Sequence, residues 1–161
     1  MGQQQLLLVI LVTIIVGIAT VVAINTFGTA ADQANIDAVN NDIATLASAA
    51  QGYFIRPEML GGGGRDFTDL TFASLSFPAS GIDEDGEIAE NENGRYVISG
   101  AAGDEFTITA HPASCEGYTP GNTDGDENGD GAGVLSPGSD CSSGDETITA
   151  LVGPNTFNLN P

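Results

Sequence analysis

The chain has 161 residues and carries 3 Lys plus Arg against 22 Asp plus Glu, a formal net charge of −19 at pH 7. This balance argues against a nucleic-acid partner, because affinity for phosphates depends on clustered cations. It also argues against attraction to an anionic bilayer surface. The acidity favours cation binding or a strongly hydrated outer surface, and solubility alone is the simpler alternative. All charged residues follow Ala31, so an uncharged N-terminal segment precedes an acidic remainder.

The uncharged segment contains an apolar run, Leu6 to Ile24, of 19 residues. Such a run is long enough to cross a hydrocarbon core of about 30 Å. No Lys or Arg precedes it, whereas an ordinary secretory signal begins with basic residues, so we do not expect an ordinary signal peptide. Small residues recur at the four-residue spacing that lets membrane helices approach closely: Thr13 with Gly17, and Ala19 with Ala23.

The helical pattern continues beyond the apolar run. Apolar residues recur at steps of three and four, which is typical of an amphipathic helix: Ile36, Val39, Ile43, Leu46, Ala50 and Tyr53. The sequence therefore predicts one helix from Met1 to about Phe54, apolar all round in its first half and amphipathic in its second. Arg56–Pro57 ends it, because the residue before proline avoids helical geometry. Asn25, Thr26 and Gly28 mark the place where a kink is expected.

A glycine run, Gly61 to Gly64, follows the helix. No Gly-Lys-Ser/Thr comes after it and no strand before it, so a phosphate-binding loop is a poor interpretation. We expect a turn that returns the next apolar residues to the helix, namely Phe67, Leu70, Phe72 and Leu75.

The remaining elements are an acidic loop and four strands. The loop spans Ile82 to Gly94, and the strands are expected at 95–99, 104–110, 146–152 and 156–159, the first two joined by a turn at Gly100 to Gly103. The predicted fold class is α+β, with a small antiparallel sheet whose apolar face packs on the second half of the helix. We divide the chain into a helical segment, 1–54, with 1–27 as its apolar part, and an acidic β-rich domain, 55–161.

Two cysteines, Cys115 and Cys141, predict a disulfide if the domain is exported. It would close a loop of 27 residues, counted from 115 to 141 inclusive, and stabilise the domain by about 3 kcal/mol in the loop-entropy model. Two unpaired thiols in a reducing compartment are the alternative.

One acidic stretch has the pattern of a calcium loop. Oxygen-bearing side chains alternate at Asp124, Asp126, Asn128 and Asp130, with Gly129 where such loops turn sharply. The twelfth position is Leu135 in place of the usual bidentate Glu, and Asp140 is the candidate substitute. A Gly/Asp-rich surface loop without an ion is the competing interpretation.

No catalytic constellation is evident. The single histidine, His111, has no second histidine with which to form a zinc site, and we expect a surface or hydrogen-bonded role. Gly-x-Ser-x-Gly is absent. The sequence predicts a protein that is not an enzyme. It indicates no certain cofactor, and a calcium ion is the single candidate.

The first 27 residues, MGQQQLLLVILVTIIVGIATVVAINTF, resemble the N-terminal segment of mature type IV pilins and pseudopilins. The MGQQQLLL start, together with YFIRPEMLGGGGRDFTDLTF at 53–72, resembles small pilin-like proteins of environmental bacteria. This resemblance implies a structural subunit of an extracellular, cell-surface filament. Identical subunits would form a helical homopolymer through their N-terminal helices, and each would be inserted in the membrane before assembly. Calcium-binding loops near the C-terminus of some pseudopilins add support by analogy to the calcium interpretation.

The sequence also departs from the pilin pattern. Pilins usually have a basic leader ending in Gly, and the sequence shows none, so we expect either a start at the mature end or unusual processing. Gln5 stands where most pilins have a Glu that pairs with a neighbouring amine, and Val22 stands where many have Pro. Gln3, Gln4 and Gln5 are then candidates for hydrogen bonds between helices. The alternative functions are a single-pass, membrane-anchored surface binding module and a minor pseudopilin of a secretion system.

Overall fold

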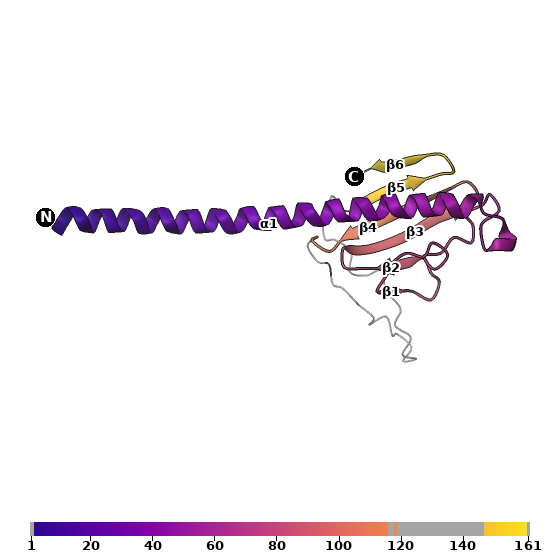
Figure 1. Cartoon of the computed structure of the whole chain (residues 1–161), viewed down its shortest axis with the longest axis horizontal. Helices are drawn as coiled ribbons and strands as arrows, with labels where there is room; N and C mark the ends of the chain where they lie inside the picture. The colour runs from indigo at the N-terminus through magenta and orange to yellow at the C-terminus, as the bar shows by residue number, and fades with distance from the viewer. Residues whose placement is uncertain (1, 116–117, 119–146, 161) are drawn as a thin grey trace. The chain divides into compact units, whose positions relative to one another are not determined.

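The fold consists of one long helix followed by an antiparallel sheet (Figure 1), in a computed structural model that describes residues 2–115, 118 and 147–160. Helix α1 spans Gly2–Ile55, and a single 3₁₀ turn, η1, spans Glu58–Leu60. The strands are β1 (Gly81–Ile82), β2 (Ile88–Glu90), β3 (Gly94–Ala102), β4 (Glu105–Pro112), β5 (Ile148–Val152) and β6 (Phe157–Asn160). The predicted α+β class, with a long N-terminal helix and an antiparallel sheet, is confirmed.

Helix α1 runs through two compact units, Met1–Ala34 and Asn35–Pro161. Its residues are helical without a break through Asn25, Thr26 and Gly28, where a kink was expected. The threonine hydroxyls there return to the helix backbone: Thr26 Oγ1 donates to the Val22 carbonyl at 2.9 Å, and Thr29 Oγ1 to that of Asn25 at 3.2 Å. These bonds leave the ladder of main-chain hydrogen bonds intact.

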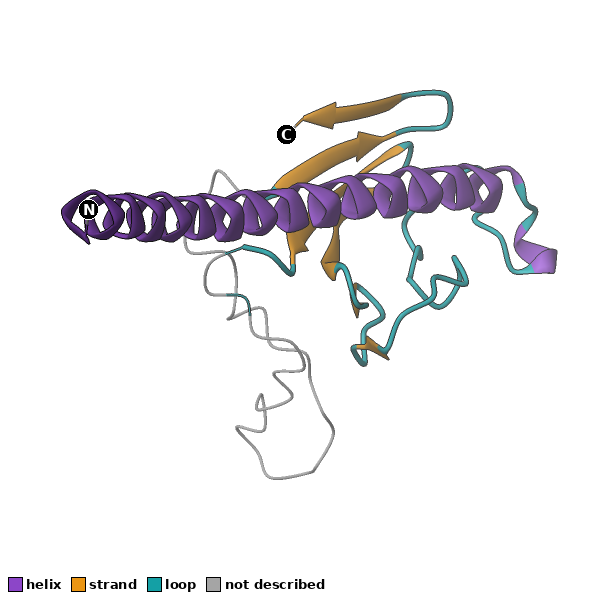
Figure 2. Ribbon diagram, turned by 60° about the vertical axis from the view of Figure 1, so that its left-hand side comes forward, coloured by secondary structure: helices purple, strands orange, loops and turns teal. Residues whose placement is uncertain are grey.

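The second unit is built on the amphipathic part of α1, which lies against one face of the sheet (Figure 2). The buried helix residues follow the predicted steps of three and four: Val39, Ile43, Leu46, Ala47, Ala50, Tyr53 and Phe54. Two hydrogen bonds fix the position of α1 over the sheet. Asp42 on one flank accepts from the Tyr96 hydroxyl of β3, and Gln51 on the other donates to the Gly153 carbonyl after β5. The helix therefore lies over β4, between these two contacts.

The glycine run completes the end of the helix. After Ile55 the chain turns at Pro57, and the amides of Gly63, Gly64 and Arg65 donate to the carbonyls of Tyr53, Arg56 and Phe54, at 2.8–3.0 Å. These bonds satisfy carbonyl groups that a helix end leaves without intrahelical partners. The predicted return of the chain is confirmed, because Phe67, Leu70, Phe72 and Leu75 are all buried. Phe67 links helix to sheet, with ring centroids 4.8 Å from Phe54 and 4.9 Å from Phe106.

The six strands pair in chain order, β1-β2-β3-β4-β5-β6, and every pair is antiparallel. Rows of residues cross the sheet on the helix-facing side. One row joins Ile98, Ile108, Ala150 and Leu159, and the next joins Phe106, Val152 and Phe157. Their members on β3, β4 and β5 are at most 2% exposed, which makes this face the core of the domain.

Two parts of the sheet differ from the prediction. The acidic stretch 82–94 contains β2 and part of β1, because Ile88, Ala89 and Glu90 pair with Val97, Tyr96 and Arg95 of β3. The β3–β4 hairpin was expected to turn at Gly100 to Gly103, but β3 continues to Ala102 and the turn lies at Gly103–Asp104. A register irregularity between Ser99 and Ala102 accommodates the extra strand residues.

Candidate functional site

The first candidate site is the uncharged part of α1. All described side chains from 2 to 34 are exposed, and the large apolar ones from Leu6 to Phe27 are 47–76% exposed. By length and composition the helix can cross a membrane, a test that a signal sequence near the N-terminus also passes. A surface this apolar is unstable in water, since burying one large apolar side chain gains about 1.5–3 kcal/mol. The segment therefore needs lipid or other protein around it.

The threonine hydroxyls of this segment are already satisfied along the helix. Thr13 Oγ1 donates to the Ile10 carbonyl and Thr20 Oγ1 to the Val16 carbonyl, each at 2.8 Å. Such internal bonds allow threonine to enter an apolar environment without leaving a donor unpaired. The segment is thus chemically suited both to lipid and to a bundle of helices.

The predicted assembly residues lie on this exposed surface. Gln3, Gln4, Gln5, Thr13, Gly17, Ala19 and Ala23 are all helical and exposed. A Cβ atom added to Gly17 would have no other atom of the described chain within 4 Å, the adjacent backbone of the helix itself not counted. The space beside Gly17 is therefore open to a second helix.

A polar cluster inside the second unit centres on Asp42. Its Oδ2 accepts three hydrogen bonds, from Asn91 Nδ2 at 2.9 Å, Asn93 Nδ2 at 2.8 Å and the Tyr96 hydroxyl at 2.7 Å. Asn93 also contacts the helix through its carbonyl, which accepts from Asn35 Nδ2 at 3.0 Å. Burial raises the pKa of Tyr96 strongly, and the hydrogen bond to Asp42 adds to the shift. The cluster fastens the helix to the turn between β2 and β3.

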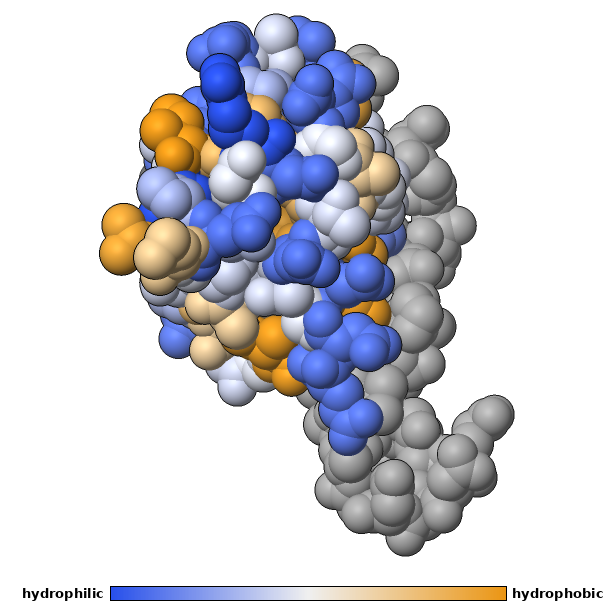
Figure 3. All heavy atoms as spheres, turned by 90° about the vertical axis from the view of Figure 1, so that its right-hand side faces the viewer, coloured by the Kyte–Doolittle hydropathy of each residue, from blue (hydrophilic) through white to orange (hydrophobic). Residues whose placement is uncertain are grey.

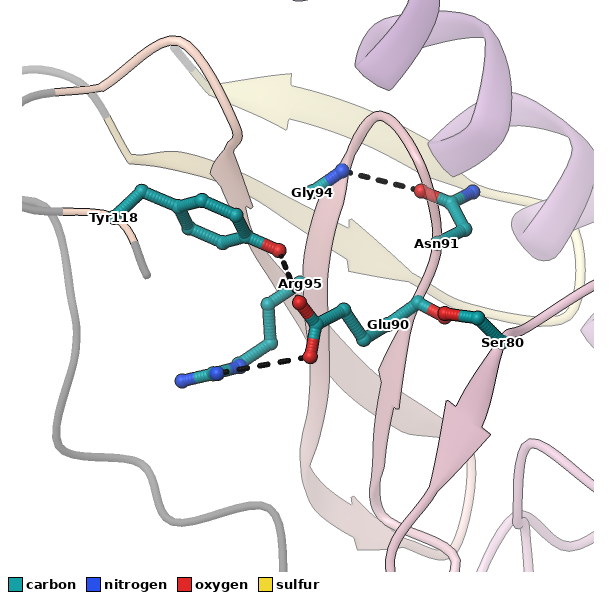
Figure 4. Close-up of polar contacts among 6 residues, drawn as sticks. All are labelled: Ser80, Glu90, Asn91, Gly94, Arg95 and Tyr118. Carbon is teal, nitrogen blue, oxygen red and sulfur yellow. Dashed lines mark hydrogen bonds and ion pairs between the residues drawn. The ribbon is translucent and has the colours of Figure 1, made fainter. Parts of the chain in front are cut away.

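A second polar cluster lies on the face of the sheet away from the helix (Figure 4). Glu90 on β2 and Arg95 on β3 are directly opposed and buried, with Arg95 Nη2 3.8 Å from Glu90 Oε2. The Tyr118 hydroxyl donates to Glu90 Oε1 at 2.7 Å, and the Arg95 guanidinium carbon lies 6.0 Å from the Tyr118 ring centroid. Burial and the bond to Glu90 raise the pKa of Tyr118. The cluster holds residue 118 against β2 and β3.

Sequence reasoning did not single out either cluster. Arg95 alternates with the buried Tyr96, which places it on the opposite face of β3, and this alternation was the available signal. His111 was expected either at the surface or hydrogen-bonded. It pairs with Arg95 in the register and is 8% exposed, which excludes the surface alternative.

The predicted calcium ligands Asp124, Asp126, Asn128, Asp130 and Asp140 lie outside the described residues, and calcium binding stays a prediction. Cys115 is buried, but Cys141 also lies outside the described residues, so the disulfide stays a prediction. Among the described residues, no three or more His, Cys, Asp and Glu side chains are grouped so as to hold a metal ion.

Comparison with protein-family models, with curated proteins and with solved structures found no match to this chain. Function must therefore be inferred from the residues of the chain itself. Among its features, the exposed apolar surface of α1 most strongly indicates a binding partner, because this surface is unstable in water.

Proposed function

We propose that the chain is a structural subunit of an extracellular helical filament, assembled through the N-terminal helices of identical copies. The observation that carries the proposal is the helical surface from Gly2 to Ala31, which has no charge and is exposed along its whole length. Before assembly this segment would lie in the membrane. The acidic second unit of each copy would form the outer wall.

Lipid covers an apolar helix almost as well as another apolar helix does, so burial alone does not favour assembly. Close packing has to supply the difference, and small residues make it possible by letting backbones approach. The open space beside Gly17, with Thr13 one turn before it, supports this part of the proposal. The glutamines at 3–5 add hydrogen-bonding groups at the end of the helix.

The second candidate is a single-pass, membrane-anchored binding module, or a minor pseudopilin that does not build the filament itself. The observation in its favour is that α1 has the length and apolar character to cross a membrane as one helix. The two candidates differ in whether copies of the helix pack together.

Electron microscopy of material sheared from cells that make the protein, with mass spectrometry of the same fraction, tests the proposal. We expect thin filaments composed mainly of this chain. If the chain stays in the membrane fraction and no filament contains it, the anchored module is the correct assignment.

Gly17→Leu separates the two candidates further. A large side chain fills the space beside Gly17, so filament yield should fall by about tenfold or more, while membrane insertion is unchanged because Leu is at least as apolar. Val16→Leu is the matched control, one large apolar residue exchanged for another on the adjacent position, and should assemble normally. Normal filaments from Gly17→Leu would show that no helix packs closely there.

A further inference from the structure

The helix-facing side of the sheet extends beyond the part that α1 covers. In the row Ile98, Ile108, Ala150 and Leu159, the first three residues are at most 2% exposed, and Leu159 is 39% exposed. In the next row Phe106 and Val152 are at most 1% exposed, and Phe157 is 40% exposed. The apolar core face therefore continues onto β6, where its two large apolar side chains are exposed, and in both views of the ribbon β6 lies clear of α1 (Figures 1 and 2).

The adjacent flank of α1 is uncharged from Ala44 to Ile55, and two of its residues there are small. Asp37, which helical geometry places on the same side, lies about two turns before Ala44. Gln51 donates to the Gly153 carbonyl at 3.2 Å, so the side of the helix that carries Gln51 faces the β5–β6 turn. Each helical residue advances by about 100°, which places Ala44, Ser48 and Ile55 within about 60° of Gln51. All three are exposed, Ile55 to 75%. We give the name neutral surface to the set Ala44, Ser48, Ile55, Phe157 and Leu159.

Charge distinguishes the neutral surface from its surroundings. The whole stretch from 147 to 161 has no charged side chain, in a chain with a net charge of −19. The other described turns of the second unit carry exposed carboxylates, at Glu58 and Asp66, at Glu84, Asp85 and Glu87, and at Asp104 and Glu105, the last pair next to Gly153 of the β5–β6 turn. Two copies that meet through those turns would bring like charges together, which is costly. The neutral surface is where a second copy can approach without that repulsion.

The apolar segment of α1 matches this surface in chemistry and in spacing. Residues 6–27 are exposed and uncharged, so contact with the neutral surface opposes no charge on either side. Neighbouring strands are about 4.8 Å apart, and β6 is two strands from β4, over which α1 lies; the offset is about 10 Å. Packed helices have their axes about 8–10 Å apart. A second helix laid beside α1 would therefore rest on β6.

We propose that the neutral surface receives the apolar helical segment, residues 6–27, of a second copy of this chain. The proposal rests on the filament assignment and names a contact within it. Phe157 and Leu159 lie beneath the incoming helix. Ala44 and Ser48 let it approach α1 closely, because Ala and Ser are among the small residues that permit close contact between helices.

Photo-crosslinking tests the contact in the full chain. A p-benzoylphenylalanine replaces Phe157 in one copy, and the same cells make a second copy that keeps Phe157 and is labelled by the mass of an Ile18→Val change. The sheared filaments and the membranes are then irradiated. We expect adducts that join position 157 to residues 6–27 of a differently labelled copy. Adducts to β6 of the second copy, to any other region, or within one copy only would overturn the proposal, as would the absence of adducts.

Leu159→Glu and Leu151→Glu form a matched pair of variants. Leu159 and Leu151 are 39% and 40% exposed, on adjacent strands, but Leu151 pairs with Asn158 on the opposite face of the sheet. We expect Leu159→Glu to lower filament yield by about tenfold or more, the effect of losing a central interface residue. Leu151→Glu should assemble normally. Thermal unfolding of both variants checks that the domain is folded, and equal yields from the two would contradict the proposal.

The outcomes separate this contact from the filament assignment. If filaments form but p-benzoylphenylalanine at position 157 crosslinks to another region, the filament assignment stands and the proposed contact is wrong. If membranes contain the adduct between position 157 and residues 6–27 but no filament forms, the contact is a pairwise association of two copies and the filament assignment is wrong.

Discussion

At the scale of single residues, Asp42 binds an unusual number of donors through one carboxylate oxygen. Three donors from the β2–β3 turn and β3 converge on its Oδ2. Hydrogen bonds to an ionised acceptor are stronger than neutral ones, and buried donors that lose their acceptor are destabilising. We expect Asp42→Ala to lower the free energy of unfolding of the domain by about 2–3 kcal/mol.

Denaturant unfolding of the full chain in detergent micelles measures this effect. Asn41→Ala is the control, because Asn41 is exposed on the same helical turn and its side chain makes no hydrogen bond within the described part of the chain; its carbonyl accepts from Thr45 Oγ1. Its effect should stay within about 0.5 kcal/mol. Equal effects from the two variants would mean that the three bonds to Asp42 contribute no net stability.

The tyrosines are expected to lower the stability of the domain at alkaline pH. The pKa values of Tyr53, Tyr96 and Tyr118 are all raised, in each case first by burial and then by carboxylates, and these are the chain's three tyrosines. Above about pH 10 the unfolded chain loses phenolic protons that the folded chain retains. The unfolded state then binds fewer protons, so stability falls as pH rises further. Below that pH the contribution is fully present.

We therefore expect tyrosinate absorbance to appear together with unfolding in an alkaline titration, and not before it. Tyr96→Phe should reduce the loss of stability per pH unit above about pH 10, while lowering stability at neutral pH through loss of the bond to Asp42. Phenolate formation in a protein that is still folded would contradict the burial argument.

At the scale of elements, the glycine run after α1 is required by close contacts. A Cβ on Gly63 would collide with the Asp66 carbonyl oxygen and stand 2.7 Å from Tyr53 Cε1. The turn has little freedom to move, because its amides bind the carbonyls at the helix end. We expect Gly63→Ala to destabilise the domain by about 3 kcal/mol, as overpacking of a well-packed site does.

Gly52→Ala is the opposite case, within the helix itself. No atom outside the local backbone lies within 4 Å of a Cβ at Gly52 in the described part of the chain. Alanine favours the helix over glycine by about 0.5–1 kcal/mol, so this variant should be more stable than the wild type. Thermal unfolding of the two variants measures both changes in stability. If Gly63→Ala stabilised the domain, the turn would not be tightly packed at Gly63.

The elements also show what the sequence could and could not predict. The helix and its buried face followed from apolar residues at steps of three and four, and its end followed from Pro57. Strand β2 has three residues, and no sequence pattern of that length distinguishes it from a loop; pairing with β3 creates it. The buried Glu90–Arg95 pair likewise depends on register, which local sequence does not determine.

For the candidate sites the division is similar. Gly17 and Thr13 were identified from their spacing on one helix, since helical geometry makes that spacing a shared face. Phe157 and Leu159 were predicted only as part of a strand. They matter because β6 is the edge strand and α1 does not cover it. Both features belong to the tertiary structure and cannot be read from local sequence.

At the scale of the whole molecule, charge and hydropathy are segregated along the chain. The first 31 residues have no charge, and the remainder holds 22 acidic residues against 3 Arg. The face of the molecule in Figure 3 is accordingly mostly hydrophilic, with apolar residues in small groups. A polymer of such chains combines an attractive apolar core with an outer wall of like charges, so its stability depends on the ionic medium.

Filaments should therefore weaken at low ionic strength, because the Debye length grows from about 8 Å at 0.15 M salt to about 30 Å at 0.01 M and neighbouring domains repel over a longer range. We expect filaments to shorten or fragment on dialysis into about 0.01 M monovalent salt, measured by electron microscopy and sedimentation. Millimolar calcium or magnesium should prevent this, since divalent ions associate with carboxylates directly. Calcium acting where magnesium does not would point to the stretch with Asp124, Asp126, Asn128 and Asp130, whereas equal effects would point to general screening. Filaments indifferent to salt over this range would show that the acidic domains are too far apart in the polymer to repel, and the proposed wall of closely spaced domains would be wrong.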